Sequence, residues 1–114
     1  MPALKTINLE EGLPTVPTAI SRLTDGLRLA RQQSFAAIKI IHGYGSHGVG
    51  GDLRIAIQGM LARMAQGGDI KAFVAGEDWR ISDEATWRLI QKYRELKQDR
   101  DLGKGNKGIT VVVL

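Results

Sequence analysis

The sequence contains no cysteine and no segment suited to secretion or to a membrane. Without cysteine, the chain has neither a disulfide framework nor a thiolate metal site. No apolar run is long enough to cross a bilayer, and no charged segment followed by an apolar one opens the chain as in a signal peptide. We therefore expect no membrane partner and a cytoplasmic location.

Length and charge narrow the remaining function classes. A chain of 114 residues fits one domain, residues 1–114, that can bury a core without metal or disulfide support. Sixteen lysines and arginines against twelve acidic residues give a net charge of +4 at pH 7. This balance permits a polyanionic partner without requiring one.

Hydrophobic periodicity predicts alternating strands and helices. Four strands are expected at residues 4–9, 36–41, 70–75 and 108–114. Apolar residues at three- and four-residue steps predict helices over residues 16–33, 52–66 and 84–96. The order β-α-β-α-β-(α)-β predicts an α/β fold, a two-layer α/β sandwich in which right-handed crossovers make the first three strands parallel neighbours.

The most informative stretch runs from Ala36 to Arg54 and reads AAIKIIHGYGSHGVGGDLR. A strand is followed there by a glycine-rich loop and a helix start, which gathers backbone N–H groups around one spot and favours a phosphate group. Glycines allow positive φ and close approach of a ligand to the backbone. The residues expected to contact the anion are Gly43, Tyr44, Gly45, Ser46, His47, Gly48, Gly51 and Arg54. Tyr44 has two interpretations, stacking on a base or packing on the adjacent helix.

Two titratable residues, Glu10 and His42, follow the first and second predicted strands. Parallel strands deliver their carboxyl ends to one edge of a sheet, so the two side chains should converge beside the loop. A carboxylate that orients an imidazole is a workable acid–base pair for phosphodiester cleavage. In the alternative, Glu10 is a solvated charge and His42 a hydrogen-bonded strand-end residue.

Other motif interpretations are weaker. Residues 43–48 match GxGxxG, and Asp69 follows at the distance of a dinucleotide fingerprint, but Asp69 would start a strand and the chain is too short for two nucleotide-binding halves. A P-loop is excluded because Val49 and Gly50 replace its lysine and hydroxyl residue. His42 and His47 each lack a second histidine at helical spacing, so we expect no metal site.

Basic residues crowd the third predicted helix and the loop after it. Acidic neighbours dilute this run, which fits either a solvated face or nucleic-acid contact, and Lys104 and Lys107 are the candidates for contact. Trp79 and Trp87 are expected to pack around an added helix. The run consists of Lys92, Arg94, Lys97, Arg100, Lys104 and Lys107.

The chain resembles the small MutS-related (Smr) domain family. The family's loop signature, HGxG…GxLR after the second strand, is matched by His42, Gly43, Gly45, Gly51, Leu53 and Arg54. Its closing GxTVVxL strand is matched by Gly108, Thr110, Val111, Val112 and Leu114. The resemblance leaves out residues 78–106, where a helical segment looks inserted.

The resemblance implies a fold like the C-terminal domain of translation initiation factor three, and a domain that binds DNA or RNA and in several members cleaves it. The family's cleavage-associated motif, Leu-Asp-Leu-His-Gly, is altered here. Asn8 replaces the aspartate and Glu10 the histidine, and one residue is added before Gly12. This departure predicts weak or lost nuclease activity and leaves a backbone-based phosphate loop intact.

Three hypotheses follow. The leading one is a nucleic-acid-binding Smr-like domain that uses the glycine-rich loop, needs no cofactor and has weak or no nuclease activity. The second is an active DNA or RNA endonuclease that uses Glu10 and His42, the one case in which a divalent metal is expected. The third is a protein-interaction domain without nucleic-acid binding, which uses the inserted helix on a protein partner.

Overall fold

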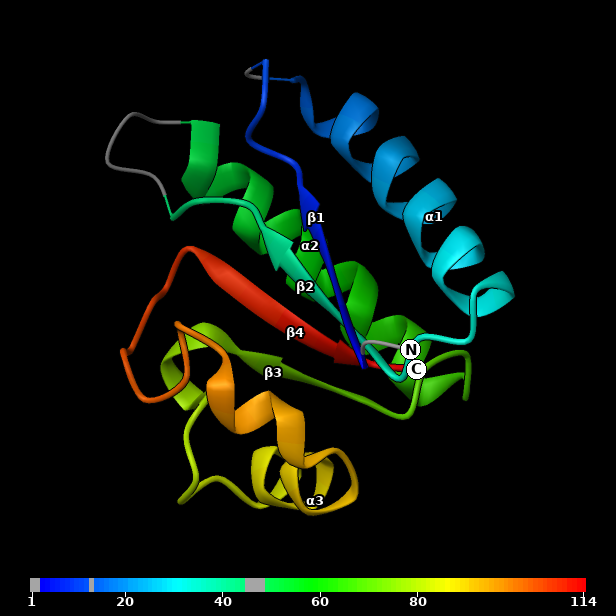
Figure 1. Cartoon of the computed structure of the whole chain (residues 1–114). Coiled ribbons are helices and arrows are strands. Elements are labelled where there is room, and N and C mark those ends of the chain that lie inside the picture. Colours follow the sequence, from blue (N-terminus) through cyan, green and yellow to red (C-terminus); the bar gives the residue numbers. More distant parts are fainter. Residues whose placement is uncertain (1–2, 13, 45–48) are drawn as a thin grey trace.

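The computed structural model describes residues 3–12, 14–44 and 49–114 (Figure 1). Strands and α-helices alternate along the chain, and two short 3-10 helices flank α3. The elements are β1 Leu4–Asn8, α1 Val16–Gln32, β2 Ala37–Ile41, α2 Val49–Gln66, β3 Ala72–Ala75, η1 Gly76–Asp78, α3 Glu84–Lys92, η2 Arg94–Gln98 and β4 Ile109–Val113. The predicted α/β class and element order are confirmed.

The four described strands form one mixed sheet in the order β1-β2-β4-β3. The expected parallel pairing of β1 with β2 is confirmed, but the prediction that β3 lies next to β2 is wrong. β4 runs antiparallel to both and separates them. Buried through Thr110 to Val112, β4 has the central position that its continuous apolar run favours.

Helix α1 begins and ends where its sequence signals lie. Thr15 caps the amino end by accepting a hydrogen bond from the Thr18 N–H, and Pro17 occupies the first turn. At the other end, the Phe35 N–H bonds to the Ala30 carbonyl across Ser34, which has a φ of 62°. This geometry is that of a Schellman cap, with serine at the position that glycine usually occupies.

The other two helices differ from their predicted bounds. Helix α2 begins at Val49, three residues before the expected start at Asp52, so Gly51 belongs to its first turn. Helix α3 ends at Lys92, because Tyr93 has an extended φ of −130°. The short helix η2 follows, and it buries Leu96, the last apolar residue of the predicted helix.

Two hydrophobic clusters cover the two faces of the sheet. On β2, Ile38 and Ile40 face the cluster under α1 and α2, whereas Ala37 faces a second cluster. The chain between β3 and β4, residues 76–108, covers this second face and is called the β3–β4 connection below. Figure 1 shows it beyond β3, away from α1. Trp79 is fully buried in the second cluster, but Trp87 is 39% exposed and lies outside both.

Candidate nucleic-acid interface

One edge of the sheet collects the residues that follow β1, β2 and β3 and those that precede β4 (Figure 1). Asn8 pairs with Ile41 in the parallel ladder, and Ile41 pairs with Ile109 in the antiparallel one. β3 ends at the same edge, because Ala75 pairs with Thr110. The predicted convergence of the strand ends beside the loop after β2 is therefore present.

His42 is completely buried at this edge, where β2 meets β4. Its Nδ1 is hydrogen-bonded to the Gly43 carbonyl oxygen, and its Nε2 lies 2.8 Å from Thr110 Oγ1. Because a carbonyl oxygen accepts and never donates, Nδ1 carries the proton and Nε2 accepts from the threonine hydroxyl. The Gln58 amide donates to the same hydroxyl oxygen at 3.2 Å and completes the chain of bonds.

The surroundings of His42 favour its neutral form. Burial lowers the pKa of the imidazole below its usual value, and nearby Arg54 acts in the same direction. The hydrogen bond to Gly43 and the carboxylates of Glu10 and Glu77 oppose this lowering of the pKa without reversing it. Both ring nitrogens are hydrogen-bonded. These contacts agree with the alternative interpretation of His42, in which it is a structural residue at the end of β2.

Gly43 begins the loop in a conformation that suits glycine. Its φ is 74°, and a Cβ placed on it would lie 2.9 Å from Glu10 Oε1, so the Glu10 carboxylate lies against the Gly43 backbone. The N–H groups of His42 and Gly43 both donate to the Gly108 carbonyl at 3.0 Å. The Gly43 amide is thus already engaged, and donors for an anion must come from later residues.

Asn8 shapes the end of β1. Its Oδ1 accepts hydrogen bonds from the N–H groups of Glu10 at 2.9 Å and Glu11 at 3.3 Å, which makes an Asx turn. An aspartate at this position could accept the same two bonds. The asparagine therefore keeps the turn and removes one negative charge from the edge.

Arg54 forms an ion pair with Glu77, an interaction that the sequence did not predict. Arg54 Nη2 lies 2.8 Å from Glu77 Oε2, with side chains 27% and 34% exposed. Arg54 Nε and Glu77 Oε1 are buried and have no hydrogen-bond partner among residues 3–12, 14–44 and 49–114. The position of Glu77, two residues after β3 at the shared edge, was the available signal. Arg54 is a fixed cation, as expected, but a partly neutralised one.

The start of α2 follows directly on the predicted anion-binding loop. The first four N–H groups of an α-helix have no acceptor within the helix, and here they include that of Gly51. Tyr44 precedes this turn and is 57% exposed, so its ring is not buried in the core. Of the predicted loop residues, Gly45, Ser46, His47 and Gly48 lie outside the described part of the chain.

Lys107 reaches the same edge through an Asx turn. Asn106 Oδ1 accepts the Gly108 N–H at 2.9 Å, and Lys107 stands exposed between these two residues. A Cβ placed on Gly108 would lie 3.7 Å from the Tyr44 ring, so the residue next to Lys107 in the chain lies beside Tyr44. Lys104 is also exposed, but no contact among the described residues links it to the edge.

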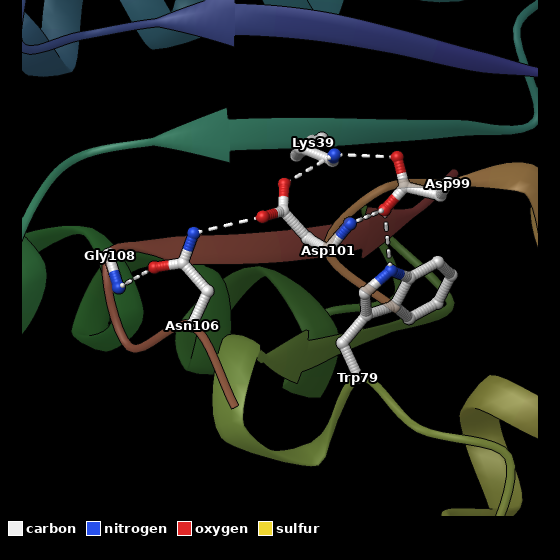
Figure 2. Close-up of polar contacts among 6 residues, drawn as sticks. All are labelled: Lys39, Trp79, Asp99, Asp101, Asn106 and Gly108. Carbon is white, nitrogen blue, oxygen red and sulfur yellow. Dashed lines mark hydrogen bonds and ion pairs between the residues drawn. The ribbon is translucent and has the colours of Figure 1, made fainter. Parts of the chain in front are cut away.

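A buried ion network holds this turn in place (Figure 2). Lys39 of β2, 5% exposed, places Nζ 2.6 Å from Asp99 Oδ1 and 2.7 Å from Asp101 Oδ2. Asp101 Oδ1 in turn accepts from Asn106 Nδ2 at 3.0 Å, and Asp99 Oδ2 accepts from Trp79 Nε1 at 2.9 Å. Burial alone would raise the pKa of Asp101, but the hydrogen bonds from Lys39 and Asn106 outweigh it and lower the pKa.

The structure also bears on the weaker motif interpretations. Asp69 lies before β3, at the sheet edge opposite the loop, and cannot reach a ligand held by the loop.

In residues 3–12, 14–44 and 49–114, no group of three His, Asp or Glu side chains could hold a metal ion. Over the same ranges, no helix is both long and apolar enough to span a bilayer.

Comparison with known proteins identifies the class. The model of the Smr domain family matches residues 11–90, so the chain belongs to the Smr domain family. This is a family of nucleic-acid-binding domains with endonuclease-related activity. Among solved structures, the chain is similar to the Smr domain of Thermus thermophilus MutS2, with a TM-score of 0.59, 25% identity and coverage of 96% of each chain. A search of curated proteins gives no match.

Proposed function

We propose that this Smr domain binds DNA or RNA at the edge formed by the loop after β2, the first turn of α2 and the turn before β4, and that it has weak or no nuclease activity. The observation that carries the proposal is that two exposed side chains, Tyr44 and Lys107, lie at the sheet edge from which the chain enters α2, whose first N–H groups have no acceptor within the helix. Amides and a cation suit phosphates, and an exposed ring suits a base.

The contacts assign the residues different tasks. Gly43, His42 and Gly108 hold the base of the loop, because their amides and carbonyls bond to one another. Phosphate contact then falls to the first turn of α2 and to Lys107, with Arg54 contributing the part of its charge that Glu77 does not neutralise. Such contacts position a backbone and read no base sequence.

The state of His42 supports weak or absent cleavage. A general base needs a lone pair within reach of the proton that it removes. Nε2 of His42 already accepts from Thr110, and the ring is sealed from solvent. The alternative endonuclease would need His42 to leave this network.

Chemical-shift mapping tests where nucleic acid binds. The ¹⁵N-labelled domain is titrated at low salt with a short single-stranded DNA and a short duplex RNA. We expect the amides of Tyr44, Gly51 and Lys107 to shift, and those of Lys71 and Leu114 at the opposite edge to stay unchanged. Shifts confined to the opposite edge, or no shifts with either nucleic acid, would contradict the proposal.

Incubation with supercoiled plasmid and with structured RNA tests the nuclease alternative. We expect wild-type protein and His42→Gln to give the same trace cleavage or none, with and without Mg²⁺. Cleavage by the wild type that His42→Gln abolishes, in a variant whose spectrum shows a native fold, would establish the Glu10/His42 enzyme instead.

A further inference from the structure

A groove at the sheet edge opposite the candidate nucleic-acid interface has no part in the proposed function. It lies between α3 and the second face of the sheet and has a volume of about 470 Å³. Its lining comes from α3, from the strand ends and from the α1–β2 turn. The lining residues are Ser34, Phe35, Ala36, Lys71, Ala72, Ala85, Arg88, Leu89, Lys92, Tyr93, Val113 and Leu114.

The floor of the groove is apolar. Leu89 of α3 and Tyr93, the residue that follows α3, line the groove together with Ala72 and Val113 from the strand ends and Phe35 from the α1–β2 turn. Leu89, Tyr93 and Val113 belong to the second hydrophobic cluster. Ala72, Tyr93 and Val113 are only half-buried, so part of this apolar surface stays open to the groove. An apolar side chain seated there would leave water at little polar cost.

The rim of the groove is cationic. Arg88 and Lys92 are spaced i,i+4 on α3, and Lys71 stands on the other wall, where its N–H donates to the Val113 carbonyl. None of the lining residues has an acidic side chain. Arg88 does pair with Glu84, but both side chains are about three-quarters exposed, and such a pair contributes little.

We propose that this groove binds an acidic peptide segment of a partner protein, with an apolar residue of that segment seated on the Leu89–Tyr93 floor. Three cations on two walls, two of them a helical turn apart, match carboxylates spread along a chain better than the single charged group of a small ligand. The apolar floor supplies the anchor pocket typical of peptide recognition. A phosphate backbone would satisfy the cations but leave the floor unfilled.

The proposal is independent of nucleic-acid binding. The groove lies where β2 and β3 begin, whereas the candidate nucleic-acid interface lies where they end, so the sheet separates the two sites. Both sites could be occupied in one molecule. A partner with an acidic tail could thereby be brought to a nucleic acid held at the other edge.

Fluorescence anisotropy with a defined probe tests the groove. The probe is a short fluorescein-labelled peptide in which glutamates flank one leucine and one phenylalanine. We expect saturable binding at low salt, and loss of binding when glutamine replaces glutamate or alanine replaces both apolar residues. The double variant Lys71→Glu/Lys92→Glu should bind the probe at least about tenfold more weakly, because charge reversal at both walls turns attraction into repulsion.

Two further variants keep the test decisive. Lys97→Glu reverses an exposed charge on η2 outside the groove and should bind the probe like the wild type. Ala85→Trp fills the groove without changing charge and should weaken binding while oligonucleotide affinity is kept. The proposal would be overturned if the wild type did not bind the probe, or if the double variant bound it as well as the wild type. It would also be overturned if Ala85→Trp lost oligonucleotide binding and kept probe binding.

Discussion

His42 acts at the residue scale as a link between β2, β4 and the loop that follows β2. Its proton lies on Nδ1 and bonds to Gly43, and its other nitrogen accepts from Thr110. This arrangement favours the neutral imidazole, because a second proton would place a charge on a fully buried ring and would take from the Thr110 hydroxyl the acceptor to which it donates. The lowered pKa of His42 therefore has a consequence for stability.

Stability should fall as the pH drops below about 6.5, the ordinary pKa of histidine in the unfolded chain. Since the folded pKa of His42 is lower, the unfolded state binds more protons in this range, and the contribution of His42 to stability is present above pH 6.5 and lost as pH falls through the folded pKa. Urea unfolding between pH 5 and 8 measures it. The fall should be smaller in His42→Gln, and equal pH profiles would contradict the neutral assignment.

Ser34 is a second residue whose conformation makes a prediction. It adopts a φ of 62° at the end of α1, where glycine avoids the clash of a Cβ with its own backbone. Ser34→Gly should stabilise the domain by about 0.5–1 kcal/mol, the left-handed penalty less the entropy cost of glycine. Thermal unfolding measures this change. Ser34→Ala keeps the Cβ and should bring no gain; an equal gain from alanine would contradict the explanation.

At the scale of elements, Gly76 lets the start of η1 meet the turn before β4. A Cβ placed on Gly76 would lie 1.7 Å from the Asn106 carbonyl oxygen and 2.7 Å from that of Ile109. Both atoms are backbone atoms, one in the turn before β4 and one in β4 itself, so neither can move aside as a flexible side chain would. The candidate nucleic-acid interface depends on this approach, because Asn106 forms the turn that presents Lys107.

Gly76→Ala should destabilise the domain by more than about 3 kcal/mol, the range in which severe steric conflict in a core falls. The matched control is Gly59→Ala inside α2, where the new Cβ meets nothing closer than 3.6 Å. That control should stabilise the domain by about 0.5–1 kcal/mol, because alanine favours a helix interior over glycine. Chemical denaturation compares the two. Similar effects from both substitutions would refute the close-approach account.

The Lys39 network joins β2 to the β3–β4 connection. Lys39→Met would leave Asp99 and Asp101 buried without their cation, and should cost about 3–5 kcal/mol. The loss should shrink at acid pH, because the Asp101 carboxyl, whose pKa the hydrogen bond from Lys39 lowers against the effect of burial, is protonated more readily once Lys39 is gone. Urea unfolding at pH 7 and pH 4 measures both effects, with Lys39→Arg as the charge-retaining control. A loss at pH 7 no larger than that of Lys39→Arg would contradict the network's role.

Local signals predicted the elements but not their partners. The predicted starts of α1 and α3, at residues 16 and 84, are confirmed, because their caps, Thr15 and Asp83, act within one turn of the helix. The place of β4 between β2 and β3 was out of reach, since strand order depends on contacts between distant residues. A lysine inside the buried run AIKII was a signal that an acidic partner exists, but nothing local points to Asp99 or Asp101.

For the candidate site too, the sequence predicted which residues lie near one another but not the bonds between them. The convergence of Glu10, His42 and the loop follows from parallel strand direction alone. The bonds that make His42 a structural residue come from Thr110, 68 positions away, and the partner of Arg54 is 23 positions away. Periodicity carries no information about such pairs.

At the scale of the whole molecule, one sheet separates two differently built edges. The edge at the ends of β1, β2 and β3 presents amides and Lys107, and the opposite edge presents an apolar groove with a cationic rim. The net charge of +4 favours polyanions at either place, so only position-specific measurements distinguish them.

The salt dependence of nucleic-acid binding tests the central claim most directly. Affinity for a short single-stranded DNA and a short duplex RNA is measured over a salt series for wild type, Lys107→Ala and Lys97→Ala. We predict that affinity falls with salt, that Lys107→Ala reduces the slope of log K against log salt by about one, and that Lys97→Ala leaves it unchanged. No binding at low salt, or equal effects of the two substitutions, would contradict the claim that nucleic acid binds at the edge after β2.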